Sequence, residues 1–251
     1  MLTLGFSDHS PLPFQNTFAL KKEELPNYCR TILLLKKKYA SHLEILLGLE
    51  IDYIPGFTIS LKEYRQDFLF DYVIGSVHFV KDIDPVSLWF IDGPEISSYE
   101  NGLMEIFNGD ARRAVTTYYR QIQEMVVEQR PDIVGHLDKV KMFNRDRFFS
   151  EGSFWYQALI DDTLHLIEKQ GCVIEVNTRG IYKKRSESLF PGLKILKKIH
   201  ERKIPITLCS DAHKPSEITM YMTEGISILK NIGFRSLMNM TRYGWKEVII
   251  E

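Results

Sequence analysis

Several features that define large classes of proteins are missing from this chain of 251 residues. Its three cysteines, Cys29, Cys172 and Cys209, are far apart and form no CxxC pair. This argues against a disulfide framework and a thiolate zinc site, and it favours a reducing cytoplasm. The longest apolar runs fall short of the roughly 18 residues of a membrane span, and the first residues lack the pattern of a signal peptide. A formal net charge of −1 provides no basic surface for nucleic acid.

Short apolar runs alternate with helix-like segments, which is typical of an α/β protein built from βα units. Hydrophobic residues make up 44% of the chain, enough for a sizeable core. The strand-like runs cover residues 4–9, 46–50, 73–78, 133–136, 173–177 and 207–213. Helical spacing of apolar residues predicts helices over 20–40, 109–129, 154–170, 191–201 and 216–229. Residues 78–109 are predicted to be an irregular loop inserted over a pocket mouth, within one domain spanning 1–251.

Each strand-like run ends on a residue that can bind a metal or a phosphate. In a β/α barrel the carboxyl ends of the strands converge on the face where chemistry occurs. Residues that are far apart in sequence can therefore meet in one pocket. The candidates for a metal site of imidazoles and carboxylates are His9, Glu50, His78, His136, Asp211 and His213.

Taken singly, these residues have simpler explanations. Glu50 could be a solvated carboxylate, and Asp211 could cap the following helix. The remaining histidines, His42, His165 and His200, do not stand at strand ends and are expected to be structural. The joint pattern favours a site, because a structural explanation needs a separate coincidence for every residue.

A polar, basic stretch follows the fifth apolar run and is the candidate phosphate-binding segment. Arg179 is close enough to the strand end to reach the pocket, and a guanidinium can grip phosphate through two parallel hydrogen bonds. Asn177 and Lys214 are further substrate-binding candidates, whereas Lys183–Arg185 could equally be a solvated loop. Lys139 and Lys141 are expected on the surface. The residues that could meet an ammonium group or a flat ring of a substrate are Glu23, Glu24, Asp52, Trp89 and Phe90.

The ordered motifs resemble the polymerase-and-histidinol-phosphatase (PHP) superfamily, and especially its histidinol-phosphate phosphatase branch. The similarity runs through almost the whole chain. It is carried by Asp-His-Ser-Pro-Leu-Pro-Phe at 8–14, Gly-Leu-Glu-Ile-Asp-Tyr at 48–53, Gly-Ser-Val-His-Phe at 75–79, Gly-His-Leu-Asp at 135–138, Glu-Val-Asn-Thr-Arg-Gly at 175–180 and Ser-Asp-Ala-His at 210–213.

The resemblance implies a distorted (β/α)7 TIM-like barrel with two or three divalent ions, zinc, manganese or iron. In that pattern Glu50 bridges two ions, and His78 and His136 hold one of them. Asp211 holds the other, and His9 and His213 belong to a third. Glu50, Asp211 and His213 are then the expected catalytic residues. A carboxylate that bridges two metal ions suits a reaction in which both ions assist displacement of the leaving group from phosphorus.

The sequence departs from the family pattern at its start, since the opening His-x-His pair and the first strand are missing. The expectation is either a chain that lacks an N-terminal segment of one βα unit or a degenerate member. The predicted activity is hydrolysis of L-histidinol phosphate in histidine biosynthesis. The alternatives are another small phosphate ester, a phosphotyrosine peptide or a nucleotide as substrate, or a non-catalytic remnant that binds metal or phosphate.

Overall fold

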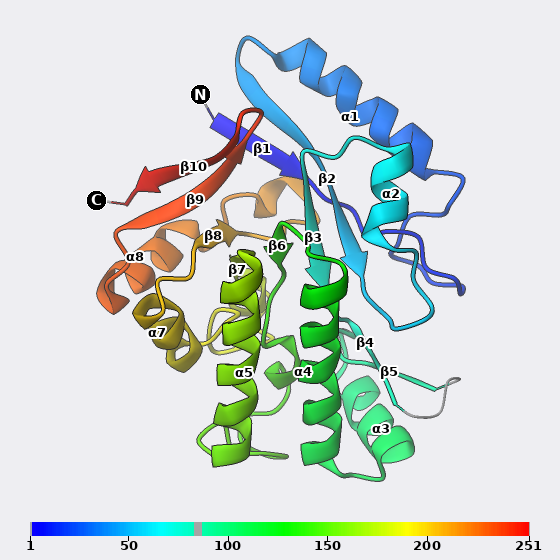
Figure 1. The fold of residues 1–251 in the computed structure, drawn as a ribbon, viewed down its shortest axis with the longest axis vertical. Coiled ribbons are helices and arrows are strands. Elements are labelled where there is room, and N and C mark those ends of the chain that lie inside the picture. The colour runs from blue at the N-terminus through cyan, green and yellow to red at the C-terminus, as the bar shows by residue number, and fades with distance from the viewer. Residues whose placement is uncertain (1, 83–86, 251) are drawn as a thin grey trace.

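The computed structural model describes residues 2–82 and 87–250 and has a curled sheet of six parallel strands at its centre (Figure 1). The strand order is β1-β2-β3-β6-β7-β8, so the strands follow one another in space as they do in sequence. Their bounds are β1 (Leu2–Phe6), β2 (Leu43–Asp52), β3 (Tyr72–Ser76), β6 (Ile133–Val134), β7 (Val173–Asn177) and β8 (Ile206–Cys209). All six predicted runs overlap these strands. The sheet is an open, curled half-barrel with helices, in the α/β class that the sequence predicted.

Two glycines allow a large side chain to pack across neighbouring strands. Tyr72, at the start of β3, lies over Gly5 of β1 and Gly48 of β2. A Cβ added to Gly5 would stand 2.3 Å from the Tyr72 hydroxyl oxygen, and one added to Gly48 would stand 2.4 Å from its ring. Both positions therefore require glycine, and the closely packed ring fixes the first three strands against one another.

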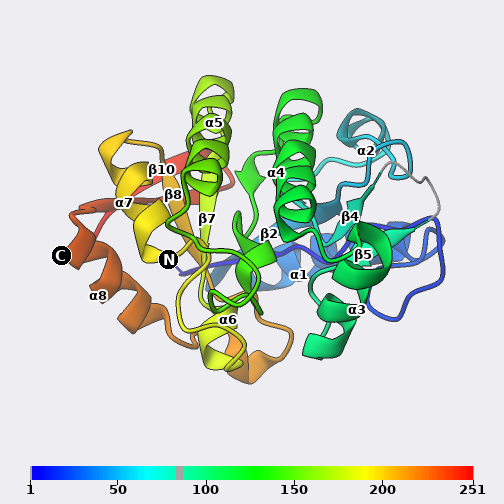
Figure 2. The same cartoon turned by 90° about the horizontal axis from the view of Figure 1, so that it is seen from below.

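The helices cover the outer face of the sheet, as Figure 2 shows from below. The five predicted helices correspond to α1 (Leu25–Tyr39), α4 (Ala111–Glu128), α5 (Phe154–Gln170), α7 (Leu193–Glu201) and α8 (Met222–Ile232). The structure adds α2 (Leu61–Asp67), the short α6 (Arg179–Tyr182) and two 3₁₀ turns, Lys139–Lys141 and Pro215–Glu217. No helix in the described ranges is both long and apolar enough to cross a membrane.

The prediction of an irregular loop over 78–109 was wrong. This segment contains a hairpin of β4 (Phe79–Lys81) and β5 (Leu88–Phe90), followed by α3 (Ile96–Phe107). Trp89 is fully buried, its ring lies 4.7 Å from that of Tyr99, and its indole Nε1 donates to the Tyr99 backbone carbonyl at 2.9 Å. Prolines and glycines in the sequence suggested a loop, but the aromatic side chains of the segment pack into the main hydrophobic core together with residues of α4 and α5.

A C-terminal hairpin packs against the inner face of the half-barrel. It consists of β9 (Ser236–Thr241) and β10 (Gly244–Ile249), which pair antiparallel beside β1 in Figure 1. Met238, Met240 and Trp245 contact the inward-facing side chains of the sheet, which are Leu46, Tyr72, Ile74, Ile133 and Val173. The hairpin thus shields an apolar surface that an open sheet would expose.

Candidate metal centre

Four strands deliver donor side chains to one edge of the sheet. Glu50 lies near the end of β2, while His78 and His136 follow β3 and β6. His9 follows β1, and its segment continues the parallel pairing, because the Glu50 amide donates to the Asp8 carbonyl at 3.0 Å and the Ser10 amide donates to the Glu50 carbonyl at 2.7 Å. Backbone pairing therefore fixes where the His9 imidazole stands relative to β2.

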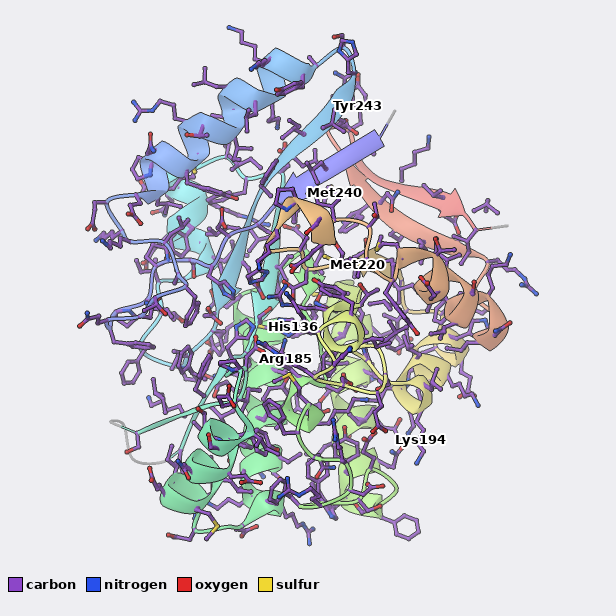
Figure 3. All side chains as sticks on the ribbon, turned by 180° about the vertical axis from the view of Figure 1, so that it is seen from behind. His136, Arg185, Lys194, Met220, Met240 and Tyr243 are labelled. Atoms are coloured by element: carbon purple, nitrogen blue, oxygen red, sulfur yellow. The ribbon has the colours of Figure 1, made fainter. Side chains whose placement is uncertain are left out.

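Glu50, His78 and His136 form the innermost group, and all three are buried. The Nε2 atoms of His78 and His136 face each other at 3.0 Å, and His136 Nε2 lies 3.2 Å from Glu50 Oε1. Nδ1 of His136 is buried without a hydrogen-bond partner among the described residues. His136 is labelled near the middle of the molecule in Figure 3. Two imidazole nitrogens and a carboxylate oxygen aimed at one point are a suitable donor set for a divalent cation.

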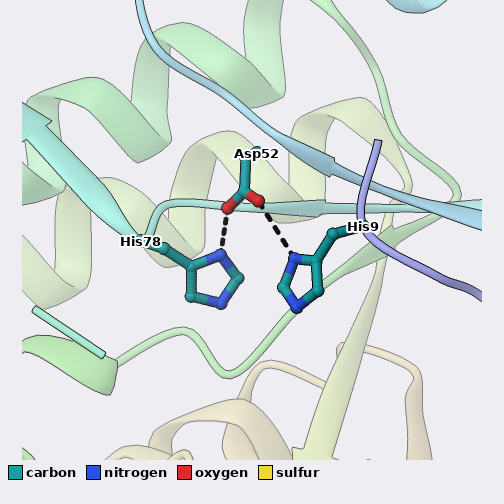
Figure 4. A group of neighbouring side chains, drawn as sticks. All are labelled: His9, Asp52 and His78. Atoms are coloured by element: carbon teal, nitrogen blue, oxygen red, sulfur yellow. Dashed lines mark hydrogen bonds and ion pairs between the residues drawn. The ribbon is translucent and has the colours of Figure 1, made fainter. Parts of the chain in front are cut away.

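Asp52 joins this group to His9 (Figure 4). It follows Glu50 by two positions on β2, so both carboxylates point to the same face of the strand. The Asp52 side chain is fully buried; it accepts a hydrogen bond from Nδ1 of His78, and its second oxygen lies 3.0 Å from Nδ1 of His9. Both histidines then direct Nε2 toward Glu50, at 3.8 Å from His78 and 3.9 Å from His9. A carboxylate behind a ligating imidazole is the usual arrangement at metal sites.

In this cluster the buried carboxylates and the histidines each shift the pKa of the other toward the charged form. Burial raises the pKa of Asp52, but the nearby His78 and His9 outweigh burial and hold it at about 2. Burial likewise raises the pKa of Glu50, yet His9, His136 and His78 hold it well below the usual range. Conversely, burial lowers the pKa of His9, and the Glu50 and Asp52 carboxylates raise it to about 10. Protons on the histidines and a bound cation are two ways of supplying the same charge.

The other half of the site is built on β7 and β8. Glu175 Oε2 accepts the His136 backbone amide at 2.7 Å, and the Asn177 amide group donates to Glu175 at 3.2 Å and to Asp211 Oδ2 at 3.1 Å. Asp211 stands after β8 with a left-handed backbone, φ 50°. This chain of hydrogen bonds links the carboxylate of Asp211 to the loop that carries His136.

Arg179 lies beside Asp211 and is held by groups of the protein. Its Nη1 donates to the Asp211 carbonyl at 2.7 Å and to Glu217 Oε2 at 3.3 Å, and the Tyr182 hydroxyl lies 3.2 Å away. His213 is the most exposed of the candidates, with 51% of its side chain accessible, and its ring centroid lies 6.5 Å from that of His9. Lys214 follows it and is exposed.

The structure thus brings His9, Glu50, His78 and His136 into one cluster, with Asp211 and His213 at its border. The other three histidines lie elsewhere: His42 and His165 are exposed, and His200 packs against Phe234 at 5.0 Å. The sequence analysis did not assign Asp52 and Glu175 to the metal centre. The two-residue spacing from Glu50 to Asp52 and from Glu175 to Asn177 was the available signal, since alternate residues of a strand share a face.

The expectation that Lys139 and Lys141 are surface charges was wrong. Lys139 is only 2% exposed, and its ammonium lies 2.9 Å from Asp92 Oδ1. The other Asp92 oxygen lies 3.6 Å from Nε2 of His78, so the pair borders the metal cluster. Lys141 is also buried and pairs with Asp138 at 2.8 Å. A buried lysine needs such a partner, because an isolated charge is costly to remove from water.

Comparison with known proteins identifies the family of this chain. The model of the PHP domain matches residues 1–179. A probable histidinol-phosphatase of Deinococcus radiodurans is 29% identical over 237 residues, covering 93% of this chain and 83% of that protein. The histidinol-phosphatase of Bacillus subtilis is 28% identical over 233 residues, with coverage of 86% and 83%.

Solved structures show the same fold. A Listeria monocytogenes protein described as a histidinol phosphatase superposes with a TM-score of 0.73 at 23% identity, covering 88% of each chain. The Lactococcus lactis histidinol phosphate phosphatase, solved with zinc, L-histidinol and phosphate, gives a TM-score of 0.68 at 18% identity and covers 98% of this chain and 88% of that one. Because the family model matches well over half of the sequence, this chain belongs to the PHP domain family.

Proposed function

We propose that this chain is a phosphomonoesterase dependent on divalent metal, and that it hydrolyses L-histidinol phosphate in cytoplasmic histidine biosynthesis. The observation that carries the proposal is the buried convergence of His78 Nε2, His136 Nε2 and Glu50 Oε1 on one point. The names of the relatives from Deinococcus and Bacillus support the choice of substrate. The single domain over 1–251 is part of the same proposal.

The residues present fit a divalent ion. Glu50, His78 and His136 would hold one ion, and Asp211, His9 and His213 would contribute to one or two more. Zinc, manganese and iron all suit imidazole and carboxylate donors. A bound divalent ion would lower the pKa of water to give a nucleophile near neutral pH and would neutralise phosphate oxygens.

The residues of the chain have distinct roles in this proposal. Asp52 accepts hydrogen bonds from the Nδ1–H groups of His9 and His78, so that the Nε2 lone pairs of both rings point toward the cluster. Glu50, Asp211 and His213 are the catalytic residues, because they would hold the ions against the phosphate of the substrate. Asn177 orients Asp211. Arg179 and Lys214 would bind phosphate oxygens, for which the guanidinium has nitrogens left beyond the Nη1 that contacts Asp211.

The test compares metal content and turnover of L-histidinol phosphate before and after chelation. Chelation should abolish turnover, and zinc or manganese should restore it. His136→Ala should lose at least about 10²-fold in kcat, since removing one electrostatic stabiliser often costs that much. The matched control is His165→Ala, which changes an exposed histidine on α5. Full turnover in protein shown to be metal-free would refute the metal-dependent mechanism, and metal binding without turnover would favour a non-catalytic remnant.

A further inference from the structure

Four phenylalanine rings form a cluster beside the metal centre, in which three rings are stacked and the fourth lies edge-on. Phe14 and Phe18 come from the loop between β1 and α1, and Phe79 and Phe90 come from the β4–β5 hairpin. Phe18 lies parallel to Phe90 at 5.9 Å between centroids and to Phe79 at 6.1 Å, while Phe14 meets the Phe79 ring edge-on at 5.2 Å. We call these four residues the aromatic shelf.

The shelf ends at the candidate catalytic cluster. The Phe18 ring meets the His9 ring in a T-shaped contact at 5.1 Å, and His9 in turn lies 3.9 Å from Glu50. Phe18 is 40% exposed, whereas Phe79 beneath it is buried. Phe14 and Phe90 are half-buried, so Phe18 is the most accessible ring of the shelf, next to the residues proposed to bind metal.

The loop that carries Phe18 has a defined conformation. The side-chain oxygen of Asn16 accepts the backbone amides of Phe18 at 3.2 Å and Ala19 at 2.8 Å. The Leu20 amide donates to the His9 carbonyl at 3.1 Å, which ties the end of the loop to the segment at the metal centre. These bonds hold the exposed ring in place before a ligand arrives, which reduces the entropy lost on binding.

We propose that Phe18 is a specificity-determining residue that binds the flat imidazole ring of the substrate. The inference rests on the proposed function, which places the phosphate of L-histidinol phosphate on the metal centre. A short carbon chain separates that phosphate from the ring, so a ring anchored beside His9 keeps the phosphate within reach of Glu50. An aromatic face attracts both a neutral heteroaromatic ring and a protonated one.

Packing within the aromatic shelf does not by itself explain why the Phe18 ring is exposed at this place. Phe79 and Phe90 already cover each other at 4.7 Å, so the stack does not need a further exposed ring for its own stability. An apolar ring kept at the edge of a polar catalytic cluster is a feature of ligand sites, in which apolar walls surround a few placed polar groups.

The experiment measures kcat/KM of the metal-loaded protein for two substrates, L-histidinol phosphate and ethanolamine phosphate. The second substrate has the phosphate and an amine but no ring. Phe18→Leu should lower kcat/KM about tenfold for L-histidinol phosphate, mainly through KM, and should change the ringless substrate far less. Phe18→Tyr, which keeps an aromatic face, should restore most of the loss. Phe154→Leu removes a ring that is 97% exposed on α5 and serves as the control.

The outcomes separate this inference from the proposed function. If Phe18→Leu lowers both substrates equally, the ring is structural and the inference is overturned. If it lowers neither, Phe18 does not contact the substrate, and the inference is again overturned. If the metal-loaded parental protein does not hydrolyse L-histidinol phosphate at all, the proposed function fails, and the inference fails with it.

Discussion

Asp52 is the residue whose surroundings are most informative about the site. A carboxylate with no exposed surface normally needs strong partners, and here both oxygens are used by the imidazoles of His78 and His9. The same contacts determine which nitrogen of each ring is free for the cluster. Asp52 therefore couples two candidate ligands, His9 and His78, that are 69 positions apart in the sequence.

We expect Asp52→Asn to weaken metal binding by about 10–100-fold, because an amide cannot accept hydrogen bonds from both imidazoles with the same strength. Titration with zinc against a competing chelator measures the affinity. Asp67→Asn, at an exposed position on the end of α2, is the matched control. Parental zinc affinity in Asp52→Asn would mean that His9 and His78 are oriented without this carboxylate.

Arg179 gives a second prediction at this scale. Arg179→Ala should lower kcat/KM for L-histidinol phosphate by about tenfold or more, with metal stoichiometry retained, and Arg179→Lys should recover only part of it because the planar fork is lost. Arg185→Ala, from the same basic stretch, is the control. A loss of metal together with activity would show instead that Arg179 acts by holding Asp211, whose carbonyl it contacts.

At the scale of single residues, the sequence predicted the donors better than their partners. His9, Glu50, His78 and His136 were recognisable because each follows a short apolar run. The burial of Lys139 could not be predicted, because its partner Asp92 comes from the loop between β5 and α3, 47 positions earlier in the sequence. A sequence pattern shows which side chains share a strand face, but it does not show which loop folds back over them.

Among the elements, the helices with a regular apolar stripe were predicted with nearly correct bounds. The prediction for α5 matches at both ends, and Gly171, with φ 72°, ends that helix by adopting the left-handed conformation. The start of α1 was placed five residues too early. The Glu24 amide donates to the Lys21 carbonyl in a turn, and Pro26 stands in the first turn of the helix.

The link between α6 and the 3₁₀ turn at Pro215–Glu217 leads to a prediction about pH. Glu217 binds Arg179 of α6 and Lys183, which directly follows α6, and it also accepts the His213 amide at 3.0 Å. Lys183 is the main cause that lowers the pKa of Glu217 from 4.5 to about 2. A depressed pKa means that this carboxylate stabilises the fold above about pH 4.5 and that the stabilisation is lost as the pH falls toward 2.

The measurement is urea unfolding of the parental protein and Glu217→Gln between pH 3 and pH 7. The variant should be less stable at neutral pH, and the difference should shrink as the pH falls. Glu187→Gln, in the loop after α6, is a suitable control. A stability difference that is constant across this range would mean that the charge of Glu217 contributes nothing and that only its shape matters.

In the whole molecule, two sets of contacts hold the strands of the open sheet together. On the inner face of the half-barrel, Met238, Met240 and Trp245 of the C-terminal hairpin cover the apolar side chains of β2, β3, β6 and β7. At the carboxyl ends, the cluster of His9, Glu50, His78 and His136 joins the end of β2 to the segments that follow β1, β3 and β6. The C-terminal hairpin was not predicted, because its sequence shows no marked alternation of apolar residues.

From the cluster at the carboxyl ends of the strands, we expect metal binding to stabilise the folded protein. The donor atoms converge only when the strands are in register, so an ion binds the folded state far better than the unfolded one. Free metal at a hundredfold excess over Kd then contributes about 2.7 kcal/mol, and a chain of this size should gain roughly 5–10 °C in Tm. Thermal unfolding of chelator-treated protein at increasing zinc or manganese measures this shift, and His136→Ala should largely abolish it while His165→Ala keeps it. An equal rise in Tm for His136→Ala would place the stabilising ion outside the Glu50–His78–His136 group, and the proposed metal centre would have to be reassigned.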